Sequence, residues 1–151
     1  MPDQLIKFFS TFCGIGYIPK APGSLASIAA LGLCLLLERH LGLYILSIGV
    51  ITGLGFMVCG RMEEIIQHKD PSCIVIDEVA GMLLSFFMLP VSWPIAVTGF
   101  FLFRAFDMFK IYPVNRFEPL PGSTGIMMDD LIAGIYTNLT MQLAVRFSGM
   151  A

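Results

Sequence analysis

The residues of this sequence that could do chemistry are five carboxylates in otherwise apolar segments. They occur in DPSCIVIDEVAG (70–81), RAFDMFKIYP (104–113) and GSTGIMMDD (122–130), and they are Asp77, Glu78, Asp107, Asp129 and Asp130. Like charges that are partly withdrawn from water repel each other, so a cation is expected among them. Oxygen ligands without histidine or cysteine suit Mg²⁺ or Mn²⁺, which also bind phosphate oxygens and water. The pattern therefore predicts a metal site for a phosphorylated ligand.

Three basic residues could hold the oxygens of such a ligand. They are Lys20 in GYIPKAPGS (16–24), Arg104 and Lys110. The spacing of Arg104, Asp107 and Lys110 is three and three, so each neighbouring pair shares a helix face. Structural interpretations stay open, because Arg104 could simply pair with Asp107 or Asp129, and Lys20 could be a cytoplasmic anchor in a turn. A single acidic residue at a helix start is also usually a cap or a dipole partner.

Missing motifs narrow the chemistry further. The sequence has no G-x-x-x-x-G-K-[ST], G-x-S-x-G or D-x-D-x-T motif and contains only two histidines. Four widely spaced cysteines, none in a C-x-x-C pair, are interpreted as reduced packing residues. Metal-assisted attack by water remains as the expected reaction.

The elements that position these residues are expected to be membrane helices. Hydrophobic residues make up 56% of the chain and charged residues 13%, with a mean hydropathy of +0.81. This composition is more apolar than that of soluble domains. The net charge of −2 gives no basic field for nucleic acid. No linker divides the 151 residues, so one domain over 1–151 is expected.

Five long helices and a short amphipathic one can be predicted from the apolar segments. Residues 21–37 and 41–60 carry no charge and are each near the length that spans a bilayer. The uncharged run 79–103 contains Pro90 and Pro94, which predict a turn between helices over 75–89 and 91–110. A single distorted span over this run is the alternative. The remaining helices are predicted at 128–147, the least apolar one, and near 5–12. The expected fold is an all-α, multi-pass membrane bundle.

The basic residues agree with the two-helix interpretation. With Lys20 inside, alternation of the helices places seven basic residues on the cytoplasmic side and leaves only Arg39 and Arg146 outside. The seven are Lys7, Lys20, Arg61, Lys69, Arg104, Lys110 and Arg116. All of the carboxylates named above then reach the cytoplasmic face. By contrast, Glu63, Glu64, His68 and Lys69 are interpreted as a solvated surface.

Two of the segments share the pattern D-x-x-A-G, in DEVAG (77–81) and DLIAG (130–134). A glycine one turn after each aspartate would let the two helices approach closely at the site.

The motifs GIGYIPKAPGSLAS, IVIDEVAGM, RAFDMFKIYPVNRFE and GIMMDDLIAGIY occur here in the order and spacing of the phosphatidylglycerophosphatase A family. The chain resembles that family over about residues 5–145. The resemblance implies an enzyme of the bacterial inner membrane that requires Mg²⁺. It would convert phosphatidylglycerol phosphate to phosphatidylglycerol, on the route to cardiolipin, at an active site facing the cytoplasm.

Family positions carry over at these residues: Lys20, Pro22, Gly23, Asp77, Glu78, Gly81, Arg104, Asp107, Lys110, Asp129, Asp130 and Gly134. Our hypothesis is that Asp77, Asp129 and Asp130 ligate Mg²⁺, and that Glu78 or Asp107 orients or deprotonates the attacking water. Lys20, Arg104 and Lys110 would bind the phosphates. A non-enzymatic cation- or lipid-binding membrane protein or transporter is the alternative function.

Overall fold

A computed structural model describes residues 1–109, 112 and 120–148, and all regular elements in these ranges are helical. The elements are α1 (Asp3–Ser10), the 3-10 helix η1 (Ile15–Tyr17), α2 (Pro22–Leu37), α3 (Leu41–Ile66), α4 (Ile76–Ser85), α5 (Trp93–Phe109) and α6 (Ser123–Ser148). The predicted all-α class is confirmed for these residues. The short N-terminal helix and the five longer helices also occur in the predicted order, but α3 extends beyond residue 60 to Ile66, α4 ends at Ser85 instead of 89, and α6 begins at Ser123 instead of 128.

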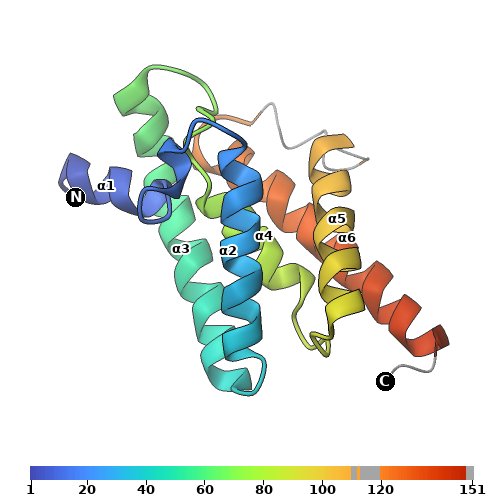
Figure 1. Cartoon of the computed structure of the whole chain (residues 1–151). Coiled ribbons are helices and arrows are strands. Elements are labelled where there is room, and N and C mark those ends of the chain that lie inside the picture. Colours follow the sequence, from blue (N-terminus) through green and yellow to red (C-terminus); the bar gives the residue numbers. More distant parts are fainter. Residues whose placement is uncertain (110–111, 113–119, 149–151) are drawn as a thin grey trace.

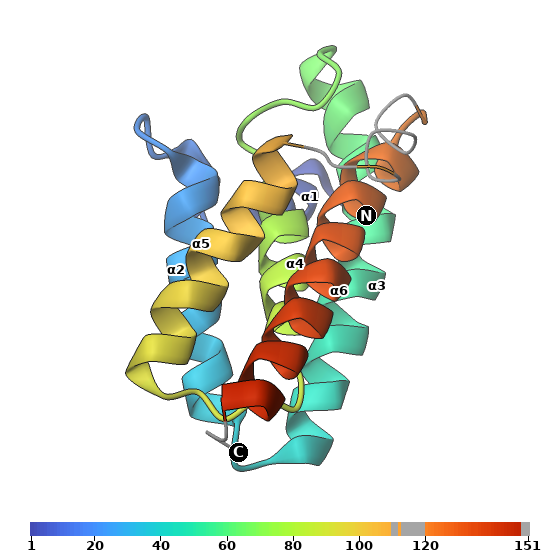
Figure 2. The same ribbon diagram turned by 90° about the vertical axis from the view of Figure 1, so that its right-hand side faces the viewer.

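The described parts of the polar segments lie mainly at one end of the helix bundle. Figures 1 and 2 show that α2, α4 and α6 begin at this end, and that α3 and α5 finish there. We call it the polar end. The opposite end holds the α2–α3 turn, the α4–α5 connection and the last turn of α6. The described parts of the four polar segments therefore lie at the same end of the molecule.

Residues 79–103 fold as two helices, so the single distorted span is wrong. Helix α4 ends at Ser85 and α5 begins at Trp93. Pro94 is the second residue of α5, where a missing N–H costs little. The break starts earlier than the prolines require, since Met88 already has a positive φ of 57°.

Polar side chains of α6 explain the early end of α4. The amide of Asn138 donates hydrogen bonds to the carbonyls of Ser85, at 3.1 Å, and Phe87, at 2.8 Å. The amide of Gln142 donates to Phe87 and Met88 at 3.4 and 3.3 Å. The carbonyl of Ser85, at the last residue of α4, and those of Phe87 and Met88 beyond it need donors from outside the helix. The polar residues that make α6 the least apolar of the five long helices thus satisfy the irregular backbone opposite it.

Helices α4 and α6 pack closely where two glycines face each other. A Cβ atom on Gly134 would collide with the carbonyl of Gly81, and one on Gly81 would lie 2.6 Å from the carbonyl oxygen of Asp130. The close approach predicted from the two D-x-x-A-G segments is therefore confirmed. It brings the acidic first turn of α4 next to Asp130 of α6.

The outside of the bundle is strongly apolar. Among the described helices, α3 alone is both long and apolar enough to cross a membrane, with a mean hydropathy of 2.1 in its most apolar window. Only 17% of that window is buried inside the protein. Helix α2 is apolar but shorter. Exposed large apolar side chains continue on the other long helices, including Leu36, Phe101, Leu139 and Leu143.

Candidate metal centre

Three carboxylates from two helices meet at the polar end. Asp77 and Glu78 lie in the first turn of α4, and Asp130 comes from α6. One oxygen from each of the three lies within 4.8 Å of the others. Asp107 and Asp129 are further negatively charged neighbours of Asp130. Since α4 and α6 approach closely at their paired glycines, the backbone holds these charges together despite their repulsion.

Burial makes this group costly without a cation. Asp77 and Asp130 are only 8% and 3% exposed. The buried oxygens Asp77 Oδ1, Glu78 Oε2 and Asp130 Oδ2 have no hydrogen-bond partner among the described residues. Buried carboxylates are normally paired, hydrogen-bonded or bound to metal, because an uncompensated one costs several kcal/mol. The donor set, all oxygen, fits a hard divalent cation.

Arg104 supplies positive charge at the edge of the group. Its Nη1 atom lies 2.7 Å from Asp107 Oδ2, one turn away on α5, and 3.9 Å from Glu78 Oε1. The expected shared helix face of Arg104 and Asp107 is confirmed, and so is the ion pair between them. That pair does not exhaust the guanidinium, which has five N–H donors. With 19% of its side chain exposed, Arg104 can still reach an anion from outside.

The start of α2 borders the same group. A Cβ atom on Gly23 would collide with the Glu78 carboxylate and would lie 3.6 Å from Arg104 Nη1. A larger residue at position 23 would therefore require the end of the Glu78 side chain to move. Ala21 has a left-handed backbone with φ of 49°, and Pro22 then opens the helix. Lys20 is exposed in the loop just before this turn.

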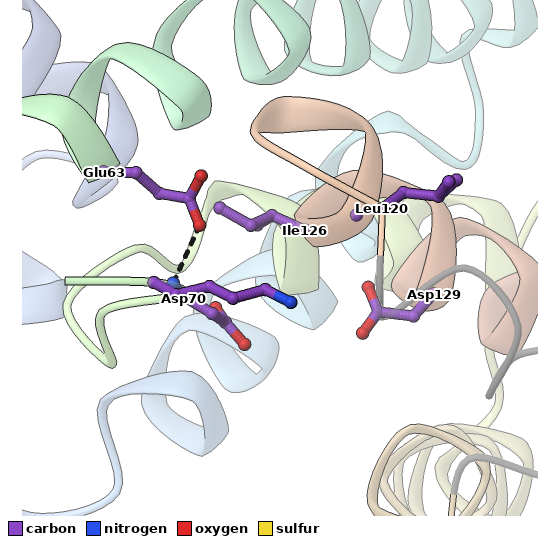
Figure 3. A pocket seen from close by; sticks show the side chains of 7 residues that line it. Glu63, Asp70, Leu120, Ile126 and Asp129 are labelled. Atoms are coloured by element: carbon purple, nitrogen blue, oxygen red, sulfur yellow. Dashed lines mark hydrogen bonds between the residues drawn. The ribbon is translucent and has the colours of Figure 1, made fainter.

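Asp129 lies beside the three carboxylates but lines a separate cavity. The cavity has a volume of about 280 Å³ and is lined by Glu63, Lys69, Asp70, Leu120, Gly125, Ile126 and Asp129. Figure 3 shows Glu63 and Asp70 on one side of it and Asp129 on the other. The backbone N–H of Asp70 donates to Glu63 Oε1 at 2.9 Å. The two adjacent aspartates of α6 thus face different surroundings.

Comparison with known proteins decides the family. The sequence model of phosphatidylglycerophosphatase A matches residues 8–145. This chain belongs to the phosphatidylglycerophosphatase A family. No solved structure matches the chain.

Curated relatives agree on a lipid phosphatase but carry two substrate names. The phosphatidylglycerophosphatase A of Escherichia coli is 33% identical over 81% of this chain and 73% of its own length. The Haemophilus influenzae enzyme of the same name is 34% identical over 82% and 78%. A Bacteroides thetaiotaomicron protein, provisionally named a phosphatidylinositol-3-phosphatase, is 32% identical over 95% of both chains.

The predicted site residues of this phosphatidylglycerophosphatase A family member do not all lie together. Asp77, Glu78 and Asp130 form the carboxylate group, and Arg104 with Asp107 borders it. Asp129 lines the neighbouring cavity, and Lys20 is exposed. Lys110 lies outside the described residues. The group of three differs from the predicted ligand set by holding Glu78 in place of Asp129, and the ligand roles remain predictions.

Sequence reasoning missed the cavity beside Asp129. The sequence predicts a solvated surface for Glu63 and Lys69. Lys69 is exposed, but Glu63 is half-buried, and both line the cavity. One signal could have indicated it, because the loop after α3 must return towards α4 through Asp70–Pro71, which keeps these side chains at the polar end.

Proposed function

We propose that this chain is a Mg²⁺-dependent phosphatase that hydrolyses the terminal phosphate monoester of phosphatidylglycerol phosphate. The products would be phosphatidylglycerol and inorganic phosphate, a step of phospholipid synthesis on the route to cardiolipin. Family membership and the names of two relatives support the reaction. The observation that carries the proposal is the group of three carboxylates with buried, unpartnered oxygens beside Arg104. A non-enzymatic cation binder has no support from the family match.

Asp77, Glu78 and Asp130 would hold the Mg²⁺ ion. Their unpartnered oxygens come from two helices whose spacing is fixed by packing, which suits a preformed site. A bound divalent cation supplies positive charge that neutralises the phosphate oxygens and polarises the phosphorus–oxygen bonds.

The remaining residues would bind the phosphate and move the proton. Arg104 donates hydrogen bonds to phosphate oxygens and stabilises their charge during transfer, assisted by Lys20 and Lys110. Asp107, held by Arg104 at 2.7 Å, accepts a proton as water attacks phosphorus. A bond forms between the water oxygen and phosphorus, the ester bond breaks, and the leaving alkoxide of the lipid takes up the proton that Asp107 accepted.

The same proposal places the chain in the bacterial inner membrane as a multi-pass protein with the polar end in the cytoplasm. Helix α3, with 26 residues, is about 39 Å long, enough to cross a bilayer. The apolar exterior and the bias of basic residues to the polar end support this arrangement. Extraction tests it, because such a protein should leave membranes with detergent and stay in them at high salt or alkaline pH. Release by salt would contradict the placement.

Phosphatidylinositol 3-phosphate is a second candidate substrate, favoured by the full-length similarity to the Bacteroides relative. Both candidate lipids carry a phosphate monoester on a polyol, which a phosphodiester joins to diacylglycerol. Phosphatidic acid differs from both, because its phosphate is attached directly to diacylglycerol.

Phosphate release from these three lipids tests the proposal. The purified protein in detergent should release phosphate from phosphatidylglycerol phosphate with Mg²⁺ and stop when EDTA is added. Faster release from phosphatidylinositol 3-phosphate would make that lipid the preferred substrate of the same phosphatase reaction. No release from any of the three by folded, Mg²⁺-loaded protein would reject the phosphatase.

A further inference from the structure

The cavity beside Asp129 lies next to the carboxylate group but is lined differently. It combines three carboxylates, those of Glu63, Asp70 and Asp129, with the ammonium of Lys69 and the apolar side chains of Leu120 and Ile126. Its volume of about 280 Å³ exceeds what one ion needs. A cavity with acceptors, one cation and apolar walls suits a small polar organic group.

Position links this cavity to the proposed reaction. Asp129 and Asp130 are adjacent on α6, so their Cα atoms are about 3.8 Å apart. Asp130 belongs to the three-carboxylate group, whereas Asp129 is a buried residue, 7% exposed, that lines the cavity. A phosphate monoester bound to a cation held by Asp77, Glu78 and Asp130 would therefore have the atoms next to its phosphate within reach of the cavity.

We propose that this cavity binds the polyol of the lipid headgroup, and that Asp129 selects substrates by accepting hydrogen bonds from its hydroxyl groups. The inference rests on the proposed phosphatase, and it gives Asp129 a role in specificity instead of metal binding. Hydroxyl groups are the natural partners of the carboxylates of Glu63 and Asp129, which accept hydrogen bonds only. Lys69 balances part of the negative charge and can approach the phosphodiester of the same headgroup.

A polyol accounts for the lining better than a second metal ion does. One oxygen from each of Asp77, Glu78 and Asp130 lies within 4.8 Å of the others, close enough to bind one ion. Among the described residues, no such group of three includes Asp129. Glu63 Oε1 already accepts the backbone N–H of Asp70, and the lining includes a lysine, which a cation would repel. The polyol is also the feature shared by the two candidate lipids and absent from phosphatidic acid.

Two soluble monoesters of matched length provide the test. Glycerol 3-phosphate carries two hydroxyl groups on its three carbons, and n-propyl phosphate carries none. Binding of each to the full chain in detergent with Mg²⁺ is measured by calorimetry, and as inhibition of lipid hydrolysis. The wild type should prefer glycerol 3-phosphate about tenfold, the value of one hydrogen bond to a charged group. The preference should fall to within about twofold in Asp129→Asn and shrink in Glu63→Gln.

Metal affinity separates this role from ligation. Mn²⁺ binding, followed by electron paramagnetic resonance, should be lost in Asp77→Asn and unchanged in Asp129→Asn. Glu64→Gln, an exposed neighbour of Glu63 outside the cavity, is the matched control and should keep both the preference and the metal.

Three results would overturn the inference. Loss of Mn²⁺ in Asp129→Asn would make Asp129 a ligand, and equal affinity of the wild type for the two monoesters would exclude polyol recognition. A preference that persists in Asp129→Asn would place recognition elsewhere. Because monoester binding is measured directly, these results are distinct from a failure of lipid hydrolysis, which would reject the phosphatase instead.

Discussion

Partly or fully buried polar side chains lie at both ends of the α4–α6 pair, and their hydrogen bonding differs between the two ends. At the α4–α5 connection, Asn138 and Gln142 donate hydrogen bonds to backbone carbonyls at and beyond the end of α4. At the polar end, Asp77, Glu78 and Asp130 keep buried oxygens without a partner. One set of polar atoms is satisfied inside the protein, and the other is not.

The difference separates polar residues that serve the fold from those that serve a ligand. A satisfied buried hydrogen bond stabilises the native state, whereas an unsatisfied buried carboxylate destabilises it until a ligand arrives. Proteins keep such costly groups mainly at functional sites. Substitutions at the polar end should therefore mainly lower activity, and substitutions at the α4–α5 connection should mainly lower stability.

The largest expected effect is on activity, at the polar end. Asp77→Asn should lower phosphate release about 10²- to 10³-fold, the range for removing one electrostatic stabilising group. Without divalent cations, the midpoint of thermal unfolding in detergent should be equal to or above that of the wild type. The reason is that Asp77 is repelled by Glu78 and Asp130, and the substitution removes this repulsion.

Saturating Mg²⁺ gives the control for Asp77→Asn. The ion should raise the unfolding midpoint of the wild type much more than that of the variant, since a ligand stabilises only the state that binds it. A variant that kept its activity but unfolded at a lower temperature without cations would show that Asp77 is a structural residue, and the comparison would fail.

The next largest effect is expected on stability and activity together, where α4 packs closely on α6. Gly134→Ala puts a methyl group against the carbonyl of Gly81 and pushes the helices apart. Overpacking of this kind costs about 1–3 kcal/mol, and a displacement of about 1 Å at a catalytic site can cost about 10²-fold in rate. Unfolding midpoints and phosphate release should therefore both fall.

Gly53→Ala on α3 is the matched control for Gly134→Ala. A Cβ atom there meets nothing within 4 Å, so the change should stabilise the helix by up to about 1 kcal/mol and leave the rate unchanged. Equal behaviour of the two variants would mean that the α4–α6 contact does not set the geometry of the carboxylates.

The sequence predicted the contact between the two glycines but not the directions of the two aspartates. Gly81 and Gly134 repeat one pattern, and prolines such as Pro90 mark the break between helices, so both features are local. Neighbouring residues on a helix point about 100° apart, so the rotation of α6 decides whether Asp129 or Asp130 joins α4. Packing against other helices sets that rotation, and no short motif records it.

The partners of Asn138 show the same limit. The Asn138 side-chain amide donates hydrogen bonds to the carbonyls of Ser85 and Phe87, which are more than fifty positions away in the sequence. Composition alone marks α6 as the least apolar of the five long helices, without indicating what its polar groups bind. The end of α4 at Ser85 depends on those bonds, which explains why the prolines alone predicted a helix reaching residue 89.

A smaller effect, on stability alone, is expected at the α4–α5 connection. Asn138→Leu removes the side-chain donor to the carbonyl of Ser85 and leaves Phe87 with only the 3.4 Å bond from Gln142, so it should destabilise the protein by about 1–3 kcal/mol. The rate per folded molecule should stay near that of the wild type, because the site lies at the other end of the bundle. Unfolding curves and turnover corrected for folded fraction measure the two.

Thr140→Val tests whether the partner of Asn138 matters. The Thr140 hydroxyl donates to the carbonyl of Tyr136 within its own helix and is exposed, so its loss should change stability by at most about 0.5 kcal/mol. If Asn138→Leu cost no more than this, or lowered turnover as strongly as Asp77→Asn, the two ends would not differ as proposed.

The smallest effect should come from an exposed charge that belongs neither to the carboxylate group nor to the cavity lining. Arg61 and Glu64 form an exposed ion pair at 3.3 Å, with about 70% of each side chain accessible. Arg61→Ala should change stability by less than about 1 kcal/mol and leave turnover unchanged, since water and salt screen such pairs.

Arg104→Ala removes a cation that is 19% exposed and borders Glu78 and Asp107, so it should reduce turnover strongly. Equal losses in the two variants would mean that burial does not distinguish functional charges in this protein, because both arginines form ion pairs and differ mainly in their surroundings.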